Sequence, residues 1–221
     1  MLSRKKILEL INGGEGLTVE FKQRFPSFEK MAKEMIAFAN TCGGYILIGV
    51  DDDKSIYGIA SEKSDIELVK ESAEKYCAPP IDYKIETVEI DCKDILIIEV
   101  AESKTKPLRI QDYKNSLELN NAQVYVRIND KSVLAGREMI KILQTQSSGA
   151  SLKNYFVGSQ EKIVFEYLDK HERITVKELS KQANISERRA SMTLIKLVRA
   201  NLLFIHLKDN GESYFTYSGT M

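Results

Sequence analysis

The sequence predicts an α+β fold in two domains, and three observations carry this prediction. Gly43-Gly44 stop a helical pattern and lead into residues 45–50, a strand that is apolar at every position except Gly49. A strand without alternation is usually covered on both faces, which indicates a mixed sheet with flanking helices. A polar stretch at residues 144–151 separates this part from short helices and a hairpin. The expected parts are a first domain at 1–146, a linker at 147–158 and a second domain at 159–221.

The first domain is expected to alternate helices with strands. Ser3 can cap a first helix that Gly13-Gly14 end, and Ser27 can cap a second helix with an apolar stripe. Between them, residues 17–22 read as a short strand with Glu20 and Lys22 on one face. The later expected elements are strands at 45–50 and 56–59, a helix at 64–76 capped by Ser64, strands near 82–90, 95–101 and 123–128, and a helix at about 136–145.

The second domain has a clearer pattern. After a first helix, Thr175-x-x-Glu178 forms a capping box that opens a short helix. Asn184 suits a left-handed turn, and Ser186 can cap a third helix with an apolar face. Asp209-Asn210-Gly211 then joins two strand-like runs as a hairpin. Two short helices joined by a tight turn and followed by a hairpin predict a winged helix-turn-helix.

The third helix of this domain is the candidate DNA-reading element. Five side chains fall opposite or beside its apolar face, and four of them are cations that suit phosphate and guanine contacts. The expected DNA-binding residues are Arg188, Arg189, Met192, Lys196 and Arg199. Two alternatives stay open: the charges only solvate the helix, or the domain mediates protein contacts, with Met192 and Ile195 at a dimer interface.

Composition argues against several classes of protein. No apolar run approaches the ~20 residues that span a bilayer, so no membrane partner is expected. Three cysteines without a Cys-x-x-Cys pair, together with two histidines, argue against structural zinc and indicate reduced thiols in the cytoplasm. Residues 151–221 carry 11 Lys+Arg against 8 Asp+Glu, a balance of +3, whereas residues 1–150 carry 21 against 24. The mildly basic second domain is compatible with nucleic-acid binding.

Several different short motifs occur along the first domain. They are Glu15-x4-Glu20-Phe-Lys22, then Ala37-Phe-Ala-Asn-Thr-x-Gly-Gly-Tyr-Ile-Leu-Ile-Gly-Val-Asp-Asp52, then Gly58, Pro79-Pro80, Lys106-Pro107 and Tyr125-Val-Arg-Ile128. This combination resembles the Schlafen-type AlbA-like domain over roughly residues 10–145. Bacterial members of that family often join this domain to a C-terminal winged helix and are described as transcriptional regulators. The resemblance therefore implies a regulator of this kind.

The resemblance also implies an alternative function. Animal Schlafen proteins include endoribonucleases in which three carboxylates of the corresponding domain hold a divalent metal. By motif position these fall on Glu15, Glu20 and either Asp51 or Asp52, of which we favour Asp52. Carboxylate oxygens suit Mg²⁺ or Mn²⁺, which can activate water. The same residues also have a plain interpretation, with Glu20 ion-paired to Lys22 and the aspartates forming a turn. Those nucleases pair two such lobes and carry zinc, so here a homodimer would have to supply the second lobe.

We therefore expect a cytoplasmic DNA-binding protein, a transcriptional regulator without enzymatic activity or cofactor. Its expected partners are double-stranded DNA, RNA as a further nucleic acid, and a second copy in a homodimer. The alternative is a metal-dependent endoribonuclease with Glu15, Glu20 and Asp52 as catalytic residues and Mg²⁺ or Mn²⁺ as cofactor. No Gly-x4-Gly-Lys-[Ser/Thr] loop occurs, so ATP hydrolysis is not expected. The cations of the later first domain are interpreted as scattered solvated charges, or, if strands align them, as a second nucleic-acid surface: Arg109, Arg127, Lys131 and Arg137.

Overall fold

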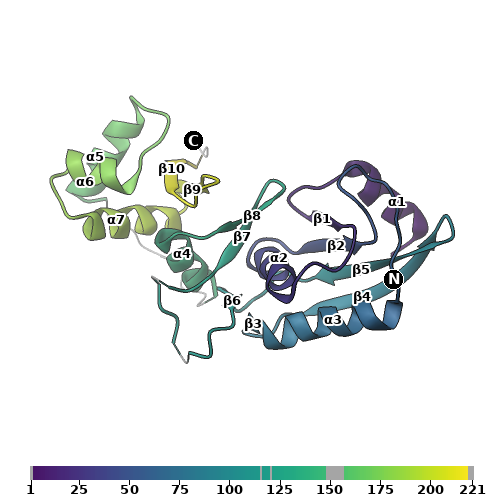
Figure 1. The fold of residues 1–221 in the computed structure, drawn as a ribbon. Coiled ribbons are helices and arrows are strands. Elements are labelled where there is room, and N and C mark those ends of the chain that lie inside the picture. The colour runs from purple at the N-terminus through teal and green to yellow at the C-terminus, as the bar shows by residue number, and fades with distance from the viewer. Residues whose placement is uncertain (1, 115, 120, 148–156, 219–221) are drawn as a thin grey trace. The chain divides into compact units, whose positions relative to one another are not determined.

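The computed structural model describes residues 2–114, 116–119, 121–147 and 157–218. The chain forms two compact units, Met1–Leu134 and Ala135–Met221 (Figure 1). The helix that the sequence assigns to the end of the first domain lies in the second unit. Most of the expected linker, residues 148–156, is outside the described residues. Among the described residues, no helix has the length and apolar character needed to span a membrane.

The described residues of the first unit form helices α1 (Arg4–Gly13), α2 (Phe28–Asn40) and α3 (Glu62–Lys75). Its strands are β1 (Val19–Lys22), β2 (Gly44–Ile48), β3 (Cys77–Ala78), β4 (Tyr83–Ile90), β5 (Lys93–Val100), β6 (Arg109–Ile110), β7 (Tyr125–Ile128) and β8 (Lys131–Leu134). Four strands form one mixed sheet in the order β1-β2-β5-β4. Strand β1 runs parallel to β2, whereas β5 is antiparallel to both of its neighbours. The expected mixed sheet with flanking helices is therefore present.

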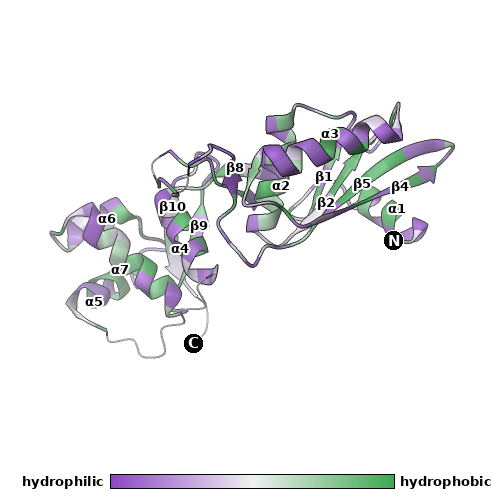
Figure 2. Cartoon of the chain, turned by 90° about the horizontal axis from the view of Figure 1, so that it is seen from below, coloured by the Kyte–Doolittle hydropathy of each residue, from purple (hydrophilic) through white to green (hydrophobic). Residues whose placement is uncertain are grey.

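Strand β2 lies inside the sheet and is covered on both faces, as its continuous apolar sequence predicts. Ile46 and Ile48 pack with α2 and α3, whereas Leu47 packs with α1 on the opposite face. Its partners on β5 alternate in the same way, since Ile98 is paired with Ile46 and Ile97 with Leu47. Figure 2 shows these central strands as hydrophobic and the outer side of α3 as hydrophilic. The two apolar layers hold the sheet between its helices.

The two glycines before β2 are required by close packing. Gly43 has a φ of +72°, and a Cβ there would lie 2.7 Å from the Val100 carbonyl oxygen. A Cβ on Gly44 would lie 2.6 Å from the Phe38 ring and 2.6 Å from the Thr18 carbonyl oxygen. Side chains at these positions would force the backbone apart, because such contacts are far inside van der Waals distance. The sheet can therefore approach the end of α2 closely.

Several local expectations differ from the structure. The strand expected at 56–59 is reduced to one bridge between Val50 and Ile56, because the chain turns at Gly58 with a φ of +79°. Ser61, and not Ser64, caps α3, since the Ser61 hydroxyl accepts the Ser64 N–H. Strands β3, β6 and β8 were not expected from the sequence. Each pairs only within a two-stranded sheet, and such short segments lack a periodic signal.

The second unit contains α4 (Arg137–Ser147), α5 (Ser159–Leu168), α6 (Val176–Gln182), α7 (Glu187–Arg199), β9 (Leu203–Leu207) and β10 (Ser213–Tyr217). Helices α5, α6 and α7 enclose an apolar core with the β9–β10 hairpin, in which Phe215 is fully buried. The expected caps are formed: Thr175 and Glu178 make a reciprocal capping box, and Ser186 accepts the Arg189 N–H. Asn184 takes the left-handed turn position, with a φ of +49°.

Candidate functional site

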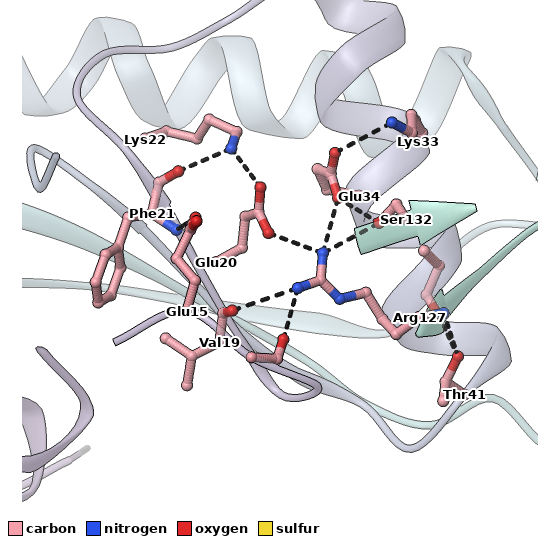
Figure 3. Close-up of polar contacts among 12 residues, drawn as sticks. Glu15, Val19, Glu20, Phe21, Lys22, Lys33, Glu34, Thr41, Arg127 and Ser132 are labelled. Carbon is pink, nitrogen blue, oxygen red and sulfur yellow. Dashed lines mark hydrogen bonds and ion pairs between the residues drawn. The ribbon is translucent and has the colours of Figure 1, made fainter. Parts of the chain in front are cut away.

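A buried guanidinium is the centre of the most polar cluster in the first unit. The side chain of Arg127, on β7, is fully buried (0% exposed) and lies over the Phe38 ring at 4.7 Å (Figure 3). Its Nη1 donates to Glu20 Oε2 at 2.8 Å and to Glu34 Oε2 at 3.2 Å. Its Nη2 donates to the Gly16 carbonyl oxygen at 2.6 Å. Arg127 is therefore no solvated charge, and the expectation for this residue was wrong.

The two carboxylates around Arg127 have further partners. Lys22 Nζ donates to Glu20 Oε1 and, at 2.8 Å, to the Phe21 carbonyl oxygen. The Ser132 hydroxyl, on β8, donates to Glu34 Oε2. Both oxygens of Glu20 are therefore occupied by cations. A buried carboxylate is tolerated only when it is paired in this way. Lys22 and Arg127 therefore balance the negative charge of Glu20.

Strand and helix periodicity bring these residues together. On β1, Phe21 points into the apolar layer under α1, so Glu20 points to the opposite face, toward α2. On α2, Glu34 lies on the buried stripe beside Met35 and Phe38. Two residues at the end of α2 hold β7 next to it. The Asn40 amide donates to the Tyr125 carbonyl oxygen at 2.9 Å, and Thr41 Oγ1 accepts the Arg127 N–H at 2.9 Å.

Glu15 lies at the edge of this cluster, on the loop that Arg127 anchors through Gly16. Its Oε1 accepts the Phe21 N–H at 2.8 Å. Burial raises the pKa of the Glu15 carboxyl above its ordinary value of 4.5, and the negative charges of Glu20 and Asp52 raise it further. The hydrogen bond from Phe21 acts in the opposite direction. Glu15, Glu20 and Asp52 are therefore close enough for their charges to interact.

The aspartates after β2 form a hydrogen-bonded turn. Asp51 accepts the side-chain amide of Gln23 at 3.2 Å and the Asp52 N–H at 3.0 Å. Asp53 accepts the Ser55 N–H at 2.8 Å. The Asp52 side chain is exposed and carries no such turn bond. Of the aspartates proposed as metal ligands, Asp52 is thus the one whose carboxylate is not used by the turn.

The expected metal ligands, as placed here, do not fit a divalent cation. Within the described part of the chain, no three Asp, Glu, His or Cys side chains are grouped so that they could hold a metal ion. Glu20 is already neutralised by Lys22 and Arg127, Asp51 belongs to the turn, and Glu15 binds a backbone N–H. The cluster consists of ion pairs between fixed side chains, and a cation would have to displace Lys22 to reach Glu20.

The candidate DNA-binding residues lie together in the second unit. Arg199, in the last turn of α7, is half-buried. The other four are exposed: Arg188, Arg189, Met192 and Lys196. Ile195, which the sequence left open as a dimer contact, is buried within the chain at 7% exposure. The exposed strip is bordered on one side by Ser191, which bonds α4, and on the other by Thr193, which bonds Gln160 of α5. The charged side of α7 is therefore left open by its neighbours.

Sequence reasoning missed the roles of Glu34 and Ser132 altogether. Glu34 had a signal, because a carboxylate three residues after Met31 and four before Phe38 stands on an apolar helical stripe and needs a partner. Ser132 had none, since an isolated serine carries no spacing that links it to a glutamate 98 residues away.

Comparison with known proteins places the first unit. The family described as Schlafen, AlbA_2 matches residues 15–136. An uncharacterized ATP-binding protein of Ureaplasma parvum serovar 3 is 29% identical over 132 residues, which cover 51% of this chain and 37% of that relative. The chain thus spans little more than a third of that protein's length.

Two solved structures are similar at low identity. One is the N-terminal domain of a Nitrosomonas europaea protein described as related to the ATP-dependent DNA helicase RecG. The two are 23% identical, the match covers 53% of this chain and 84% of that chain, and the TM-score is 0.40. The other is the DIP2311 protein of Corynebacterium diphtheriae, with 16% identity, 97% of this chain, 39% of that chain and a TM-score of 0.46.

Proposed function

The chain belongs to the Schlafen, AlbA_2 family, and from this premise we propose that it is a DNA-binding protein that regulates transcription. In this proposal the second unit is a winged helix-turn-helix that reads double-stranded DNA with α7. The first unit contributes dimerisation, nucleic-acid contact or signal reception. The protein acts in the cytoplasm as a homodimer, and its DNA binding requires no cofactor.

The order and packing of elements in the second unit support the winged-helix proposal. Helices α6 and α7 are joined through a left-handed Asn184, and the β9–β10 hairpin packs on the same core. Ile174 forms an isolated antiparallel bridge with Phe215 on β10, through backbone hydrogen bonds of 2.9 and 2.8 Å. In helix-turn-helix proteins, the second helix of the pair enters the major groove and the first crosses the backbone. Here that second helix is α7.

The observation that carries the proposal is the charge on the open side of α7. Arg188, Arg189 and Lys196 are exposed, and no carboxylate of the described residues forms an ion pair with any of them. Cations held away from acidic partners are available for phosphates and for guanine edges. Met192, 47% exposed in the middle of the strip, can contact a thymine methyl group.

The tip of the hairpin adds no net positive charge. It reads Lys208-Asp209-Asn210-Gly211-Glu212, and Lys208 is paired with Glu212 at 3.1 Å. Helix α7 must therefore supply most of the attraction to phosphates. If its three exposed cations each neutralise one phosphate, the logarithm of affinity falls with the logarithm of salt with a slope of about −2.7 per chain. A fourfold rise in salt then weakens binding roughly 40-fold.

The test measures DNA affinity at several salt concentrations for the full chain. Genomic fragments retained by the protein first supply a duplex for fluorescence anisotropy. We expect Arg188→Ala and Lys196→Ala each to weaken binding and to reduce the salt slope by about 0.9. Lys170→Ala is the matched control, because Lys170 is an exposed lysine in the turn after α5. Unchanged affinity in both α7 variants would refute the role assigned to this helix.

A metal-dependent endoribonuclease is the second candidate, favoured by one observation. Burial raises the pKa of Glu15, and the charges of Glu20 and Asp52 add to this rise, as expected where carboxylates gather. Against it stand the ion pairs of Glu20 with Lys22 and Arg127. The candidate predicts cleavage of tRNA with Mn²⁺ or Mg²⁺ that disappears in Glu20→Gln. Intact tRNA after incubation with the wild-type protein and either metal would dismiss it.

The name of the Ureaplasma relative includes ATP binding, but we do not propose ATP binding for this chain. Gly43-Gly44 follows a helix, whereas a phosphate-binding glycine loop precedes one. These glycines also have a packing role that accounts for them fully.

A further inference from the structure

The start of α4 lies between α7, which the proposal assigns to DNA, and the turn of the β9–β10 hairpin. A Cβ on Gly136, just before α4, would lie 2.9 Å from the Gly211 carbonyl oxygen in the hairpin turn. On the other side, the Ser191 hydroxyl of α7 donates to Glu138 Oε1 at 2.8 Å. Figure 1 shows α4 beside both α7 and the hairpin. The residue between these two anchors is Arg137.

Arg137 is exposed, and no carboxylate of the described residues forms an ion pair with it. Lys141 follows four residues later, on the same side of α4. Because Gly136 packs closely against the hairpin turn and Glu138 is hydrogen-bonded to α7, the backbone of Arg137 lies between α7 and that turn. A free guanidinium held in this way can donate two parallel hydrogen bonds to one phosphate.

We propose that α4 is a second part of the DNA-binding surface, in which Arg137 contacts a backbone phosphate next to the segment bound by α7. This inference rests on the proposed function, since it takes α7 to lie in the major groove. The contact is to the backbone and carries no base preference, so Arg137 fixes the position of the domain on the duplex. It also places a cation beside the tip of the hairpin, which carries no net positive charge.

The experiment compares the salt dependence of duplex binding for five proteins. They are the wild type, Arg137→Ala, Arg137→Lys, Lys196→Ala and the control Lys170→Ala. We expect Arg137→Ala to reduce the salt slope by about 0.9. Between 50 and 200 mM salt, the factor by which its affinity falls should then be roughly 3.5 times smaller than for the wild type. Arg137→Lys keeps the charge and should keep the slope. The loss in Arg137→Ala should be equal for a specific duplex and for an unrelated one.

The outcomes separate this inference from the function on which it rests. A slope reduced in Lys196→Ala and unchanged in Arg137→Ala overturns the role of Arg137 and leaves the role of α7 in place. A slope reduced in Arg137→Ala and unchanged in Lys196→Ala keeps the phosphate contact of Arg137 and overturns the contact assigned to Lys196. Unchanged affinity of Arg188→Ala as well would refute α7 as the reading helix. If neither variant differs from the wild type, or if the wild type binds no duplex, both assignments fail.

A second variant tests position without removing charge. Ser191→Ala deletes the hydrogen bond that holds Glu138 against α7 and leaves every cation in the surface. We expect weaker binding, a salt slope reduced toward that of Arg137→Ala, and a folded circular dichroism spectrum. Binding equal to that of the wild type would contradict the fixed placement of Arg137.

Discussion

Replacing Arg127 by methionine is the most direct test of the ion pairs that Arg127 forms with Glu20 and Glu34. The methionine keeps apolar contact with the Phe38 ring but leaves two buried carboxylates, Glu20 and Glu34, without their shared cation. It also removes the donors to the Gly16 and Val19 carbonyl oxygens. Removing one partner of a buried ion pair typically costs about 3–5 kcal/mol, because the remaining charge is stranded. We therefore expect a loss of this size in the free energy of unfolding.

Urea unfolding, followed by far-ultraviolet circular dichroism, measures the loss. With a slope of about 2 kcal/mol per molar urea, the midpoint should fall by roughly 1.5–2.5 M. The control is a triple variant, Arg127→Met with Glu20→Gln and Glu34→Gln, in which no buried carboxylate lacks its cation and most of the stability should return. A loss below about 1 kcal/mol in the single variant, or a triple variant no more stable than the single one, would show that the pairs contribute little.

Two further predictions concern stability. The raised pKa of Glu15 means that the folded chain binds this proton more tightly than the unfolded chain, so stability falls as pH rises from 4.5 through the folded pKa. Glu15→Gln should flatten the profile of urea midpoint against pH in this window, and a profile identical to the wild type would contradict the burial of this charge. Gly44→Ala should cost about 1–3 kcal/mol, because its Cβ would meet the Phe38 ring and the Thr18 carbonyl oxygen at 2.6 Å. Gly13→Ala, whose Cβ meets nothing within 4 Å, is the matched control and should be neutral or stabilising by thermal denaturation; equal losses in both would refute the packing argument.

Local signals in the sequence predicted the elements of the fold well. The caps at Ser3, Ser27 and Ser186 each form the expected hydrogen bond, since capping depends on residues only three positions apart. The covered strand β2 was predicted by its lack of alternation. The short strands β3 and β6 were missed, because two residues carry no periodicity and their pairing joins segments about thirty residues apart.

The candidate acidic site could be predicted only in part. The motifs placed Glu15, Glu20 and Asp52 in one region, and the charges of Glu20 and Asp52 add to the rise that burial causes in the pKa of Glu15. The sequence also offered the ion pair of Glu20 with Lys22, which the structure contains. It did not indicate that Arg127 would take up the charge of Glu20, since a cation so distant along the chain has no periodic relation to it. This second cation became visible only in three dimensions.

The pairing of Arg127 with Glu20 also has a consequence for the order of events during synthesis. The two residues are 107 positions apart, so Glu20 and Glu34 leave the ribosome long before their cation does. At about 5–20 residues per second, the wait is roughly 5–20 seconds. During that time the first strand and α2 cannot bury their acidic sides against each other at low cost. The nascent chain should therefore complete this unit only after β7 has emerged, and a fragment cut before residue 127 should fail to dock α2.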